Sequence, residues 1–401
     1  MSGSPPIALA EAWERLLRDA APLGEELLPI GNALGRHLAH PLWAKRTQPA
    51  ADLSAMDGYA MGAQDLAGPW RVVGESAAGH PFPRTLSPGE AARISTGALM
   101  PDGAGAVLLQ ENARRDGPHL ALNGKGDPTP RHIRRAGFDF REGDEVLPAG
   151  IRLGAPQIAL AVAAGHGTLT VTRLPSLAVI DSGDELAADP ADCPPHRIPA
   201  SNGAMLAAMA ATHAGEIRRI GPVADTGAAL AAALAQADGA DVIVTSGGVS
   251  VGDHDLVRPA LEQWGAALEF WRVAIKPGKP LLLARRGRQW IIGLPGNPVS
   301  SYVTAFLFLL PLLRRLGGAA DVLPAGFAAP LAAPLAAGGD RHEFIRARLA
   351  QGKVAPLGEQ DSSALAALGR ANALIDRPPG APALTENALV RVYPLENGGN
   401  A

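Results

Sequence analysis

The chain has 401 residues, of which 47% are hydrophobic, so it is long enough for about three domains with sizeable cores. Its 36 basic and 39 acidic residues give a net charge of −3, which argues against a general nucleic-acid-binding protein, because such proteins carry a strong basic excess. Cys193 is the only cysteine, so neither an intrachain disulfide nor a Cys-x-x-Cys metal site can form, and in its Pro-rich loop the thiol is expected to be inert.

The N-terminus lacks the basic region followed by an apolar run that is typical of a signal peptide. The longest apolar stretch, Val303–Leu313, is interrupted by Pro311 and is shorter than the ~20 residues that span a bilayer. We therefore expect a cytoplasmic protein without a membrane segment, in which this stretch forms a buried helix.

The first part of the chain predicts two small units. Residues Ile7–His40 are expected to be helical, because Leu16, Leu17 and Ala20 recur at helical spacing. Between about 46 and 139, many Gly and Pro residues separate short runs of strand composition, which predicts a small β-rich domain. Residues 140–175 have mixed character and are expected to form a linking domain together with residues 1–45.

From residue 176 the pattern alternates between apolar strands and helices. This alternation predicts a doubly wound, mostly parallel sheet over residues 176–317. Asn202, Asp225 and Asn297 are the expected helix N-caps, and Pro298 suits the first helical position. The run Pro324–Gly338 is expected to be a linker into a C-terminal β-rich domain, residues 318–401. The predicted fold class is therefore multidomain, α/β plus β, with an N-terminal helical segment. The expected strands are Leu177–Ile180, Ile217–Ile220, Val242–Thr245, Phe270–Ile275, Leu281–Ala284 and Trp290–Gly293.

Polar and charged residues follow the predicted strands of this α/β domain. Three carboxylates lie in the segment Asp181–Glu185, Asp225 follows the second strand, and the Gly-rich loop Ser246–Asp255 follows the third. Lys276 and Lys279 and the turn Pro295–Ser300 follow later strands. Because ligands of open α/β sheets bind outside the carboxyl ends of the strands, we expect these groups to surround one crevice. Carboxylates there suit Mg²⁺, and lysines with backbone N–H groups suit phosphate.

Each of these features also has a structural explanation. Gly247-Gly248 alone is more often a turn, and Asp225 alone is more often a helix cap. Lys276 and Lys279 are as well explained as surface charges beside prolines. The segments around Asp57 and Thr96 are best explained, from the pattern alone, as β-turns. The functional interpretation therefore depends on these groups lying together.

Six segments, in this order, resemble the MoeA family, to which the gephyrin E domain is related. They are Met56–Ala60, Ser95–Ala98, Gly183–Leu186, Thr245–Gly252, Ile275–Pro280 and Leu294–Ser300. The resemblance implies an elongated homodimer of four-unit chains in which residues 176–317 resemble the MogA fold. It implies insertion of molybdenum from molybdate into adenylylated molybdopterin, with cleavage of the pyrophosphate, release of AMP and a requirement for Mg²⁺. It also implies a site between the MogA-like unit of one subunit and the β unit of the other.

The resemblance assigns roles to individual positions. It implies carboxylate ligands for Mg²⁺ at Asp57, Glu185, Asp225 and Asp255. The catalytic residues that it implies are these four together with Thr96, Lys276 and Lys279. The substrate-binding residues that it implies are Ser246, Gly247, Gly248, Ser250, Gly252, Arg272, Pro295, Asn297, Pro298, Ser300, Arg346 and Ser362.

The sequence departs from the family pattern at two positions. Arg272 stands where a lysine is frequent, which changes the donor geometry, and Ala200 stands where a carboxylate is frequent. Two other functions stay open: the adenylylation step of a MogA-type enzyme, and a scaffold that binds a peptide. A MogA-type adenylyltransferase and proteins that mature molybdoenzymes are possible partners.

Overall fold

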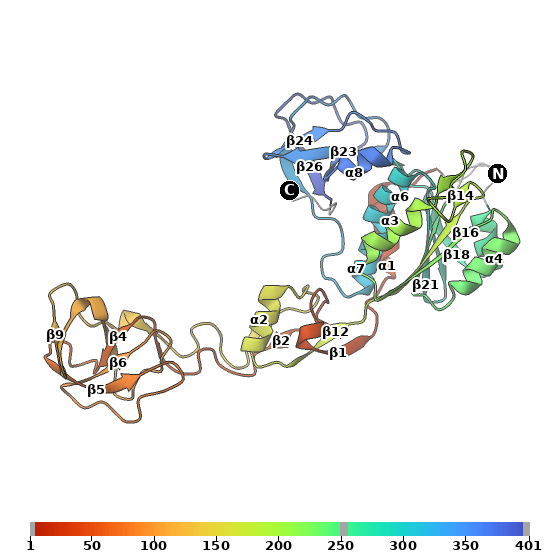
Figure 1. Cartoon of the computed structure of the whole chain (residues 1–401). Helices are drawn as coiled ribbons and strands as arrows, with labels where there is room; N and C mark the ends of the chain where they lie inside the picture. The colour runs from red at the N-terminus through yellow and green to blue at the C-terminus, as the bar shows by residue number, and fades with distance from the viewer. Residues whose placement is uncertain (1–4, 249–255, 396–401) are drawn as a thin grey trace.

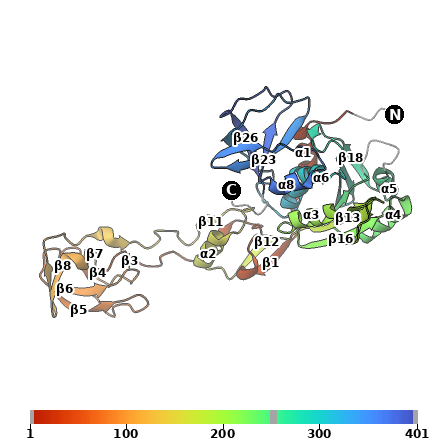
Figure 2. The same cartoon turned by 45° about the horizontal axis from the view of Figure 1, so that its top comes forward.

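A computed structural model describes residues 5–248 and 256–395 of the chain as an elongated molecule (Figure 1). A β-rich unit lies at one end and a small linking unit lies in the middle. An α/β unit and a C-terminal β unit lie together at the other end, and the same arrangement is seen from a second direction (Figure 2). The chain is therefore multidomain, with α/β and β-rich parts as the sequence predicts.

The β-rich unit contains a six-stranded sheet in the order β7-β4-β6-β5-β9-β8 and a separate pair, β3 with β10. Trp70, Met61 and Leu108 are buried in one of its two apolar clusters. The bounds are β3 Leu53–Ser54, β4 Gly58–Met61, β5 Trp70–Ser76, β6 Glu90–Ile94, β7 Ala106–Leu109, β8 Ala113–Asp116, β9 His119–Leu122 and β10 Ile133–Arg134. Short 3-10 helices lie at Gln110–Asn112 and Pro130–His132.

The linking unit pairs the two segments that flank the β-rich unit in the sequence. Strand β1 (Glu25–Pro29) is antiparallel to β12 (Thr168–Thr172), and β2 (Leu42–Trp43) is antiparallel to β11 (Glu145–Leu147). Helix α2 (Ala155–Ala163) covers this unit.

The prediction of helix over Ile7–His40 is wrong beyond Arg18. Helix α1 spans Leu9–Arg18, Pro22 and Gly24 follow within two turns, and the next residues form β1 and a 3-10 turn. Proline restricts the residue before it and glycine favours other conformations, so the helical pattern cannot continue. Helix α1 packs on the α/β unit, where Leu9, Ala12 and Leu16 join the largest apolar cluster.

The α/β unit has a six-stranded sheet between two layers of helices. Its order is β16-β13-β17-β21-β20-β18; the first four strands are parallel, and β20 is antiparallel to both of its neighbours, β21 and β18. Helices α1, α3, α6 and α7 cover one face, and α4 and α5 cover the other. The bounds are β13 Ser176–Ser182, α3 Ser201–Ala210, β16 Glu216–Val223, α4 Gly227–Gln236, β17 Val242–Ser246, α5 Val257–Gln263, β18 Ala267–Trp271, β20 Leu282–Arg286, β21 Gln289–Leu294, α6 Pro298–Thr304 and α7 Leu310–Leu316; a short pair, β14 Leu186–Ala187 with β15 Ile198–Pro199, lies beside the sheet.

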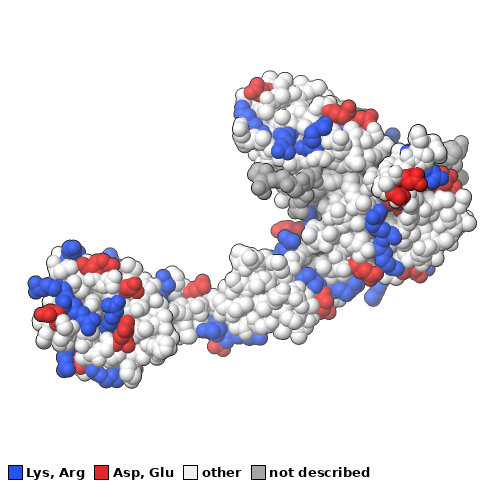
Figure 3. All heavy atoms as spheres, in the orientation of Figure 1, with Lys and Arg blue, Asp and Glu red and all other residues white. Residues whose placement is uncertain are grey.

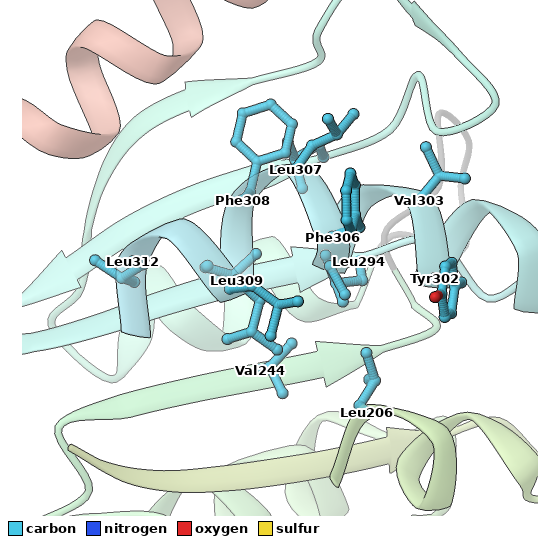
Figure 4. Packing of buried hydrophobic residues seen from close by; sticks show 14 of the residues in the cluster. Leu206, Val244, Leu294, Tyr302, Val303, Phe306, Leu307, Phe308, Leu309 and Leu312 are labelled. Atoms are coloured by element: carbon cyan, nitrogen blue, oxygen red, sulfur yellow. The ribbon is translucent and has the colours of Figure 1, made fainter. Parts of the chain in front are cut away.

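The helix that begins at Pro298 is the centre of the main core (Figure 4). It continues from α6 through a π-helical turn, Ala305–Leu309, into α7. Pro311 has no N–H, so it cannot donate to the carbonyl four residues before it. That carbonyl, on Leu307, accepts a hydrogen bond of 2.8 Å from the indole of Trp13, which anchors α1 to the core. The helix is long and apolar enough to cross a membrane, but 89% of its most apolar window is buried inside the protein, as expected for a core helix.

The C-terminal unit is a β-sheet in the order β19-β23-β25-β26-β22, with β24 beside β23. The prediction of a plain linker at Pro324–Gly338 is wrong, because this segment contains β22, an edge strand that ends at a proline, where no further ladder hydrogen bond is needed. Strand β19 comes from the α/β part of the sequence and joins this sheet, parallel to β23. The bounds are β19 Ile275–Lys276, β22 Phe327–Pro330, β23 His342–Ala350, β24 Lys353–Pro356, α8 Leu365–Arg370, β25 Ala373–Arg377 and β26 Leu389–Pro394.

On the face of the molecule in Figure 3, basic and acidic side chains are interspersed over the β-rich unit. On this face, the β-rich unit therefore shows no extended region of positive charge of the kind that binds nucleic acid.

Candidate functional site

A cavity of about 800 Å³ opens at the carboxyl ends of the parallel strands β13, β17 and β21. The start of α3, the start of α6 and two residues of the C-terminal unit, Ser363 and Leu365, complete its wall. The structure thus brings several of the predicted groups together at the sheet edge, as the strand-end rule predicts. The predicted site residues that line the cavity are Glu185, Ser246, Gly247, Gly248, Pro295, Asn297 and Pro298.

Gly247 and Gly248 form the turn that ends β17. Both have positive φ angles, 93° and 67°. A Cβ atom on Gly247 would lie 2.3 Å from the carbonyl oxygen of Ser182, and one on Gly248 would lie 2.6 Å from a methyl carbon of Val257. Only glycine fits both positions. The Gly247 N–H donates to the Leu294 carbonyl at 3.3 Å, and the Gly248 N–H is of the kind that holds phosphate.

Asn202 ties the neighbouring loops together. Its side-chain nitrogen donates to Ser246 Oγ at 2.9 Å and to the carbonyl of Gly296 at 2.7 Å. The prediction that Asn202 caps its helix is wrong, because α3 begins one residue earlier and Asn202 lies inside its first turn. The amide instead fixes the ends of β17 and β21 relative to each other.

Asn297 occupies the N-cap position of α6 and Pro298 the first helical position, as predicted. The Asn297 side chain does not cap the helix but donates to Ser362 Oγ at 2.9 Å, while the Ser362 carbonyl accepts from the Val299 N–H. Ser362 therefore holds the C-terminal unit against the start of α6. Ser300 is 5% exposed inside this helix and does not line the cavity, so the prediction that it contacts substrate is not supported by its position.

Arg346 does not have the free guanidinium that a molybdate-binding role requires. The side chain is 1% exposed and donates to the carbonyls of Glu359, Asp361 and Ala364, at 3.0, 2.9 and 3.2 Å. Its place in the structure is thus to shape the segment that carries Ser362. The predicted binding role of Arg346 is corrected on this ground, because all of these hydrogen bonds are internal.

The carboxylates that follow β13 and β16 lie in one connected pair of loops. The Asp225 N–H donates to Asp184 Oδ1 at 3.1 Å, and the Asp184 N–H donates to Asp225 Oδ2 at 3.4 Å. The Glu185 side chain turns back over Gly183, where a Cβ would lie 2.4 Å from its Oε2. Asp225 does not cap α4, since the Oγ1 of Thr226 accepts the capping N–H of Ala229.

These carboxylates fit only part of a metal site. Among residues 5–248 and 256–395, no group of three or more His, Cys, Asp or Glu side chains lies close enough to hold a metal ion. Mg²⁺ commonly uses one or two carboxylates and completes its shell with water and substrate phosphate oxygens, so Glu185 and Asp225 are of a suitable type and number. Of the other two predicted ligands, Asp57 lies on the β-rich unit, and Asp255 lies outside the described residues, together with Ser250 and Gly252.

The two predicted lysines lie on the loop that leads from β19 to the cavity wall at Pro280. Lys276 has an exposed side chain whose Nζ lies 3.0 Å from Oε1 of Glu343, and the Lys279 residue is exposed. Gly278, with φ of 103°, lets this loop approach α6, because a Cβ there would lie 2.4 Å from a Thr304 methyl carbon. Neither lysine lines the cavity itself.

Arg272 also lies outside the cavity wall. Its guanidinium lies 4.3 Å from the centre of the Trp271 ring, so the charge is placed by a cation–π contact. Arg272 has a φ of 80°, which is uncommon for a residue with a side chain. The strand expected at Phe270–Ile275 is accordingly broken here, and its last residue, Ile275, begins β19 of the other sheet.

Asp57 and Thr96 meet in the β-rich unit. The Thr96 N–H donates to Asp57 Oδ1 at 2.7 Å, and this hydrogen bond holds the pKa of the Asp57 carboxyl below its usual value. Within one chain this pair lies at the opposite end of the molecule from the α/β unit (Figure 1). A single chain therefore cannot bring Asp57 to the cavity in this conformation.

Asp181 is a cavity residue to which the sequence analysis gave no role of its own. It lies beyond the last apolar residue of β13, is 5% exposed, and lines the cavity. Burial raises the pKa of its carboxyl to about 6, against smaller opposing contributions from the charge of Arg219 and a hydrogen bond from the Gly203 N–H. The sequence placed Asp181 with the carboxylates that follow the first strand rather than inside it, because the apolar run ends at Ile180 although the strand continues to Ser182.

Replacing Asp181 with asparagine is expected to stabilise the folded chain near neutral pH. The raised pKa means that the folded state binds more protons than the unfolded state between about pH 4 and 6, so the wild type loses stability as the pH rises through this window. Asparagine does not titrate, so its advantage in free energy of unfolding should grow from near zero at pH 4 to roughly 1–3 kcal/mol at pH 7. Urea titrations of both proteins at the two pH values measure this, and an equal difference at both would contradict it.

Comparisons with known proteins cover almost the whole chain. Residues 7–165 match the family model "MoeA N-terminal region (domain I and II)", residues 178–315 match "Probable molybdopterin binding domain", and residues 328–395 match "MoeA C-terminal region (domain IV)". A protein of Nostoc sp. named molybdopterin molybdenumtransferase is 36% identical over 306 residues, which are 74% of this chain and 70% of that protein.

The chain belongs to the MoeA family. Two further proteins are similar to this chain over nearly its full length. Molybdopterin molybdenumtransferase 2 of Mycobacterium tuberculosis is 33% identical over 386 residues, 92% of this chain and 94% of that protein. The crystal structure of a molybdopterin biosynthesis MoeA protein from Pyrococcus horikoshii superposes with a TM-score of 0.84 at 25% identity, and covers 97% of this chain and 100% of that one. The MoeA resemblance predicted from the six sequence segments is thereby confirmed, and the chain belongs to a family of transferases.

Proposed function

We propose that this MoeA-family chain inserts molybdenum from molybdate into adenylylated molybdopterin, adding water across the pyrophosphate bond and releasing AMP. The observation that supports it most directly is that the Gly247-Gly248 turn, the Glu185 carboxylate and the end of the lysine loop at Pro280 surround one cavity. Relatives that align over most of the chain carry the name molybdopterin molybdenumtransferase.

The residues around the cavity differ in charge, and each group is proposed to bind a different part of the substrates. The backbone N–H of Gly248 is placed to hold a phosphate oxygen at the end of β17, whereas the Gly247 N–H donates to the Leu294 carbonyl at 3.3 Å. The ammonium groups of Lys276 and Lys279, on the adjoining loop, attract molybdate, which is a tetrahedral dianion. Asn202 holds the ends of β17 and β21 together, and Asn297 holds the C-terminal unit beside them, so that all three surround the ligand.

Glu185, which lines the cavity, and Asp225, on the loop that contacts Asp184, would hold Mg²⁺. When bound there, the ion supplies positive charge that offsets the charge developing on the phosphate of the departing AMP. Aspartate and glutamate oxygens together with water are the ligands that Mg²⁺ prefers.

The active unit is proposed to be a homodimer. Asp57 and Thr96 form a hydrogen-bonded pair on a unit that lies far from the cavity of its own chain (Figure 2). A second copy that presents its β-rich unit to the cavity would supply them, so that each site would combine residues of two chains.

The experiment that tests the function incubates the purified protein with adenylylated molybdopterin, Mg²⁺ and molybdate, and measures AMP together with the molybdenum cofactor formed. AMP release that depends on molybdate and matches cofactor formation supports the proposal. Release of AMP without cofactor would contradict it.

The two alternatives give different products in related assays. A MogA-type adenylyltransferase would form adenylylated molybdopterin from MgATP and molybdopterin, which the α/β unit alone could support. A peptide-binding scaffold would capture one short peptide without any nucleotide chemistry. The match of residues 7–165 and 328–395 to MoeA regions favours molybdenum insertion, since an adenylyltransferase leaves those units without a role.

A further inference from the structure

Asp181 presents a buried carboxyl at the wall of the cavity. Among residues 5–248 and 256–395, its hydrogen-bond donor is the N–H of Gly203 in the first turn of α3, and Arg219 acts on it through its charge. A carboxylate has about four acceptor positions, and a buried one with a single donor is costly to maintain. Such a group is better explained as an acceptor of hydrogen bonds from a bound ligand.

The surroundings of Asp181 are built to hold the carboxyl in place. A Cβ atom at position 203 would lie 2.0 Å from Oδ2 of Asp181, so the carboxyl occupies space that only a glycine leaves free. Ser246, the register partner of Asp181 on β17, lines the same cavity and accepts the Asn202 amide at 2.9 Å. Asp181, Ser246 and Asn202 thus form a polar wall of the cavity. This wall offers a carboxylate, whereas the phosphate-binding turn offers a backbone N–H donor.

The chemistry of a carboxylate selects one part of the proposed ligand. Two carboxylate oxygens match two parallel N–H donors, as in bidentate pairs with guanidinium groups. The pyrimidinone edge of a pterin offers such a pair in its 2-amino group and the adjacent ring N–H. Adenine offers one amino group flanked by acceptors, and phosphate and molybdate are anions that the carboxylate repels.

We propose that Asp181 binds the 2-amino-4-oxopyrimidine edge of the pterin and so sets which end of the ligand enters this part of the cavity. This inference rests on the proposed function for the identity of the ligand. The pterin then lies beside β13 and α3, and the pyrophosphate extends toward the Gly247-Gly248 turn.

The test measures binding of two fragments, a 6-alkylpterin and AMP, to the full-length protein and its variants by calorimetry. Asp181→Asn keeps the size and the acceptor for Gly203 but opposes one pterin N–H with an amide N–H. We expect pterin affinity to fall at least about tenfold, in line with losing one buried charged hydrogen bond, with AMP affinity unchanged within about twofold. Asp181→Ser is a second variant in case the first does not fold.

Asp241→Asn is the matched control, because Asp241 is also a carboxylate of this sheet but lies at the opposite end of β17, paired with Arg173 at 2.9 Å. It should bind both fragments as the wild type does. Any of four results would overturn the proposal. They are wild-type affinity for the pterin in either Asp181 variant, equal losses of affinity for pterin and AMP, a loss confined to AMP, and no pterin binding by the wild type. Selective loss of pterin binding in a protein that releases no AMP with molybdate would support this site and refute the proposed reaction.

Discussion

Replacing Lys276 with alanine is expected to lower molybdate-dependent AMP release by about 10²–10³-fold, which corresponds to about 3–4 kcal/mol of lost transition-state stabilisation. The side chain belongs to β19, which is tied into the C-terminal sheet beside β23, so its position is set by two units at once. Its Nζ lies 3.0 Å from Glu343, and the incoming dianion has to compete with that carboxylate. Single-turnover release of AMP at saturating molybdate measures the effect on chemistry apart from binding.

Lys353→Ala is the matched control for this prediction. Lys353 is also an exposed lysine of the C-terminal sheet, on β24, and it faces Glu386 and Asn387. Its removal should change the rate less than about twofold, because exposed ion pairs contribute little. Glu343→Gln should in turn strengthen molybdate binding by freeing the ammonium of Lys276. A wild-type rate in Lys276→Ala would show that the lysine is a surface charge, the other explanation that the sequence allows.

The sequence predicted the α/β unit and the edge of its sheet at which polar groups converge. Short apolar runs such as Val242–Thr245 can be recognised because both faces of a parallel strand are buried. Asn297 and Pro298 marked the start of a helix by their conformational preferences. These predictions succeeded because they depend on local preferences and on one rule of α/β topology.

The sequence could not show which polar side chains are already occupied by the protein itself. Arg346 resembles a free cation in the sequence, but three backbone carbonyls more than ten residues away accept its hydrogen bonds. Asp181 resembles a loop residue, but the strand extends past the apolar run and buries it. Both outcomes depend on contacts between distant segments, which neither periodicity nor composition reports.

Asp57 and Thr96 illustrate the same limit between units. Each lies on a turn when the pattern alone is considered, and only the fold of the β-rich unit shows that one binds the other. Within a single chain both residues lie far from the cavity (Figure 1). No sequence pattern could indicate whether they contribute to the cavity of their own chain or to that of a second copy.

Mixing inactive Asp57→Ala and Lys276→Ala proteins is expected to restore activity from almost none to about one quarter of the wild-type level. If Asp57 of one subunit serves the cavity of the other, a heterodimer of the two variants has one site that carries both substitutions and one site that carries neither. Random exchange places about half of the chains in heterodimers, so about one quarter of all sites become intact. AMP release after unfolding and refolding the mixture, compared with each variant refolded alone, measures the recovery.

The result distinguishes two arrangements that use the same site residues, one across subunits and one within a single chain. If Asp57 instead acted on the cavity of its own chain through a large bend of the linking unit, every subunit of the mixture would carry one substitution, and activity would stay at the level of the single variants. The folded linking unit between the two ends favours the arrangement across subunits. Mixing Asp57→Ala with Glu185→Ala should give the same recovery, whereas mixing Lys276→Ala with Glu185→Ala should give none, because both of those positions lie on the same side of the proposed interface.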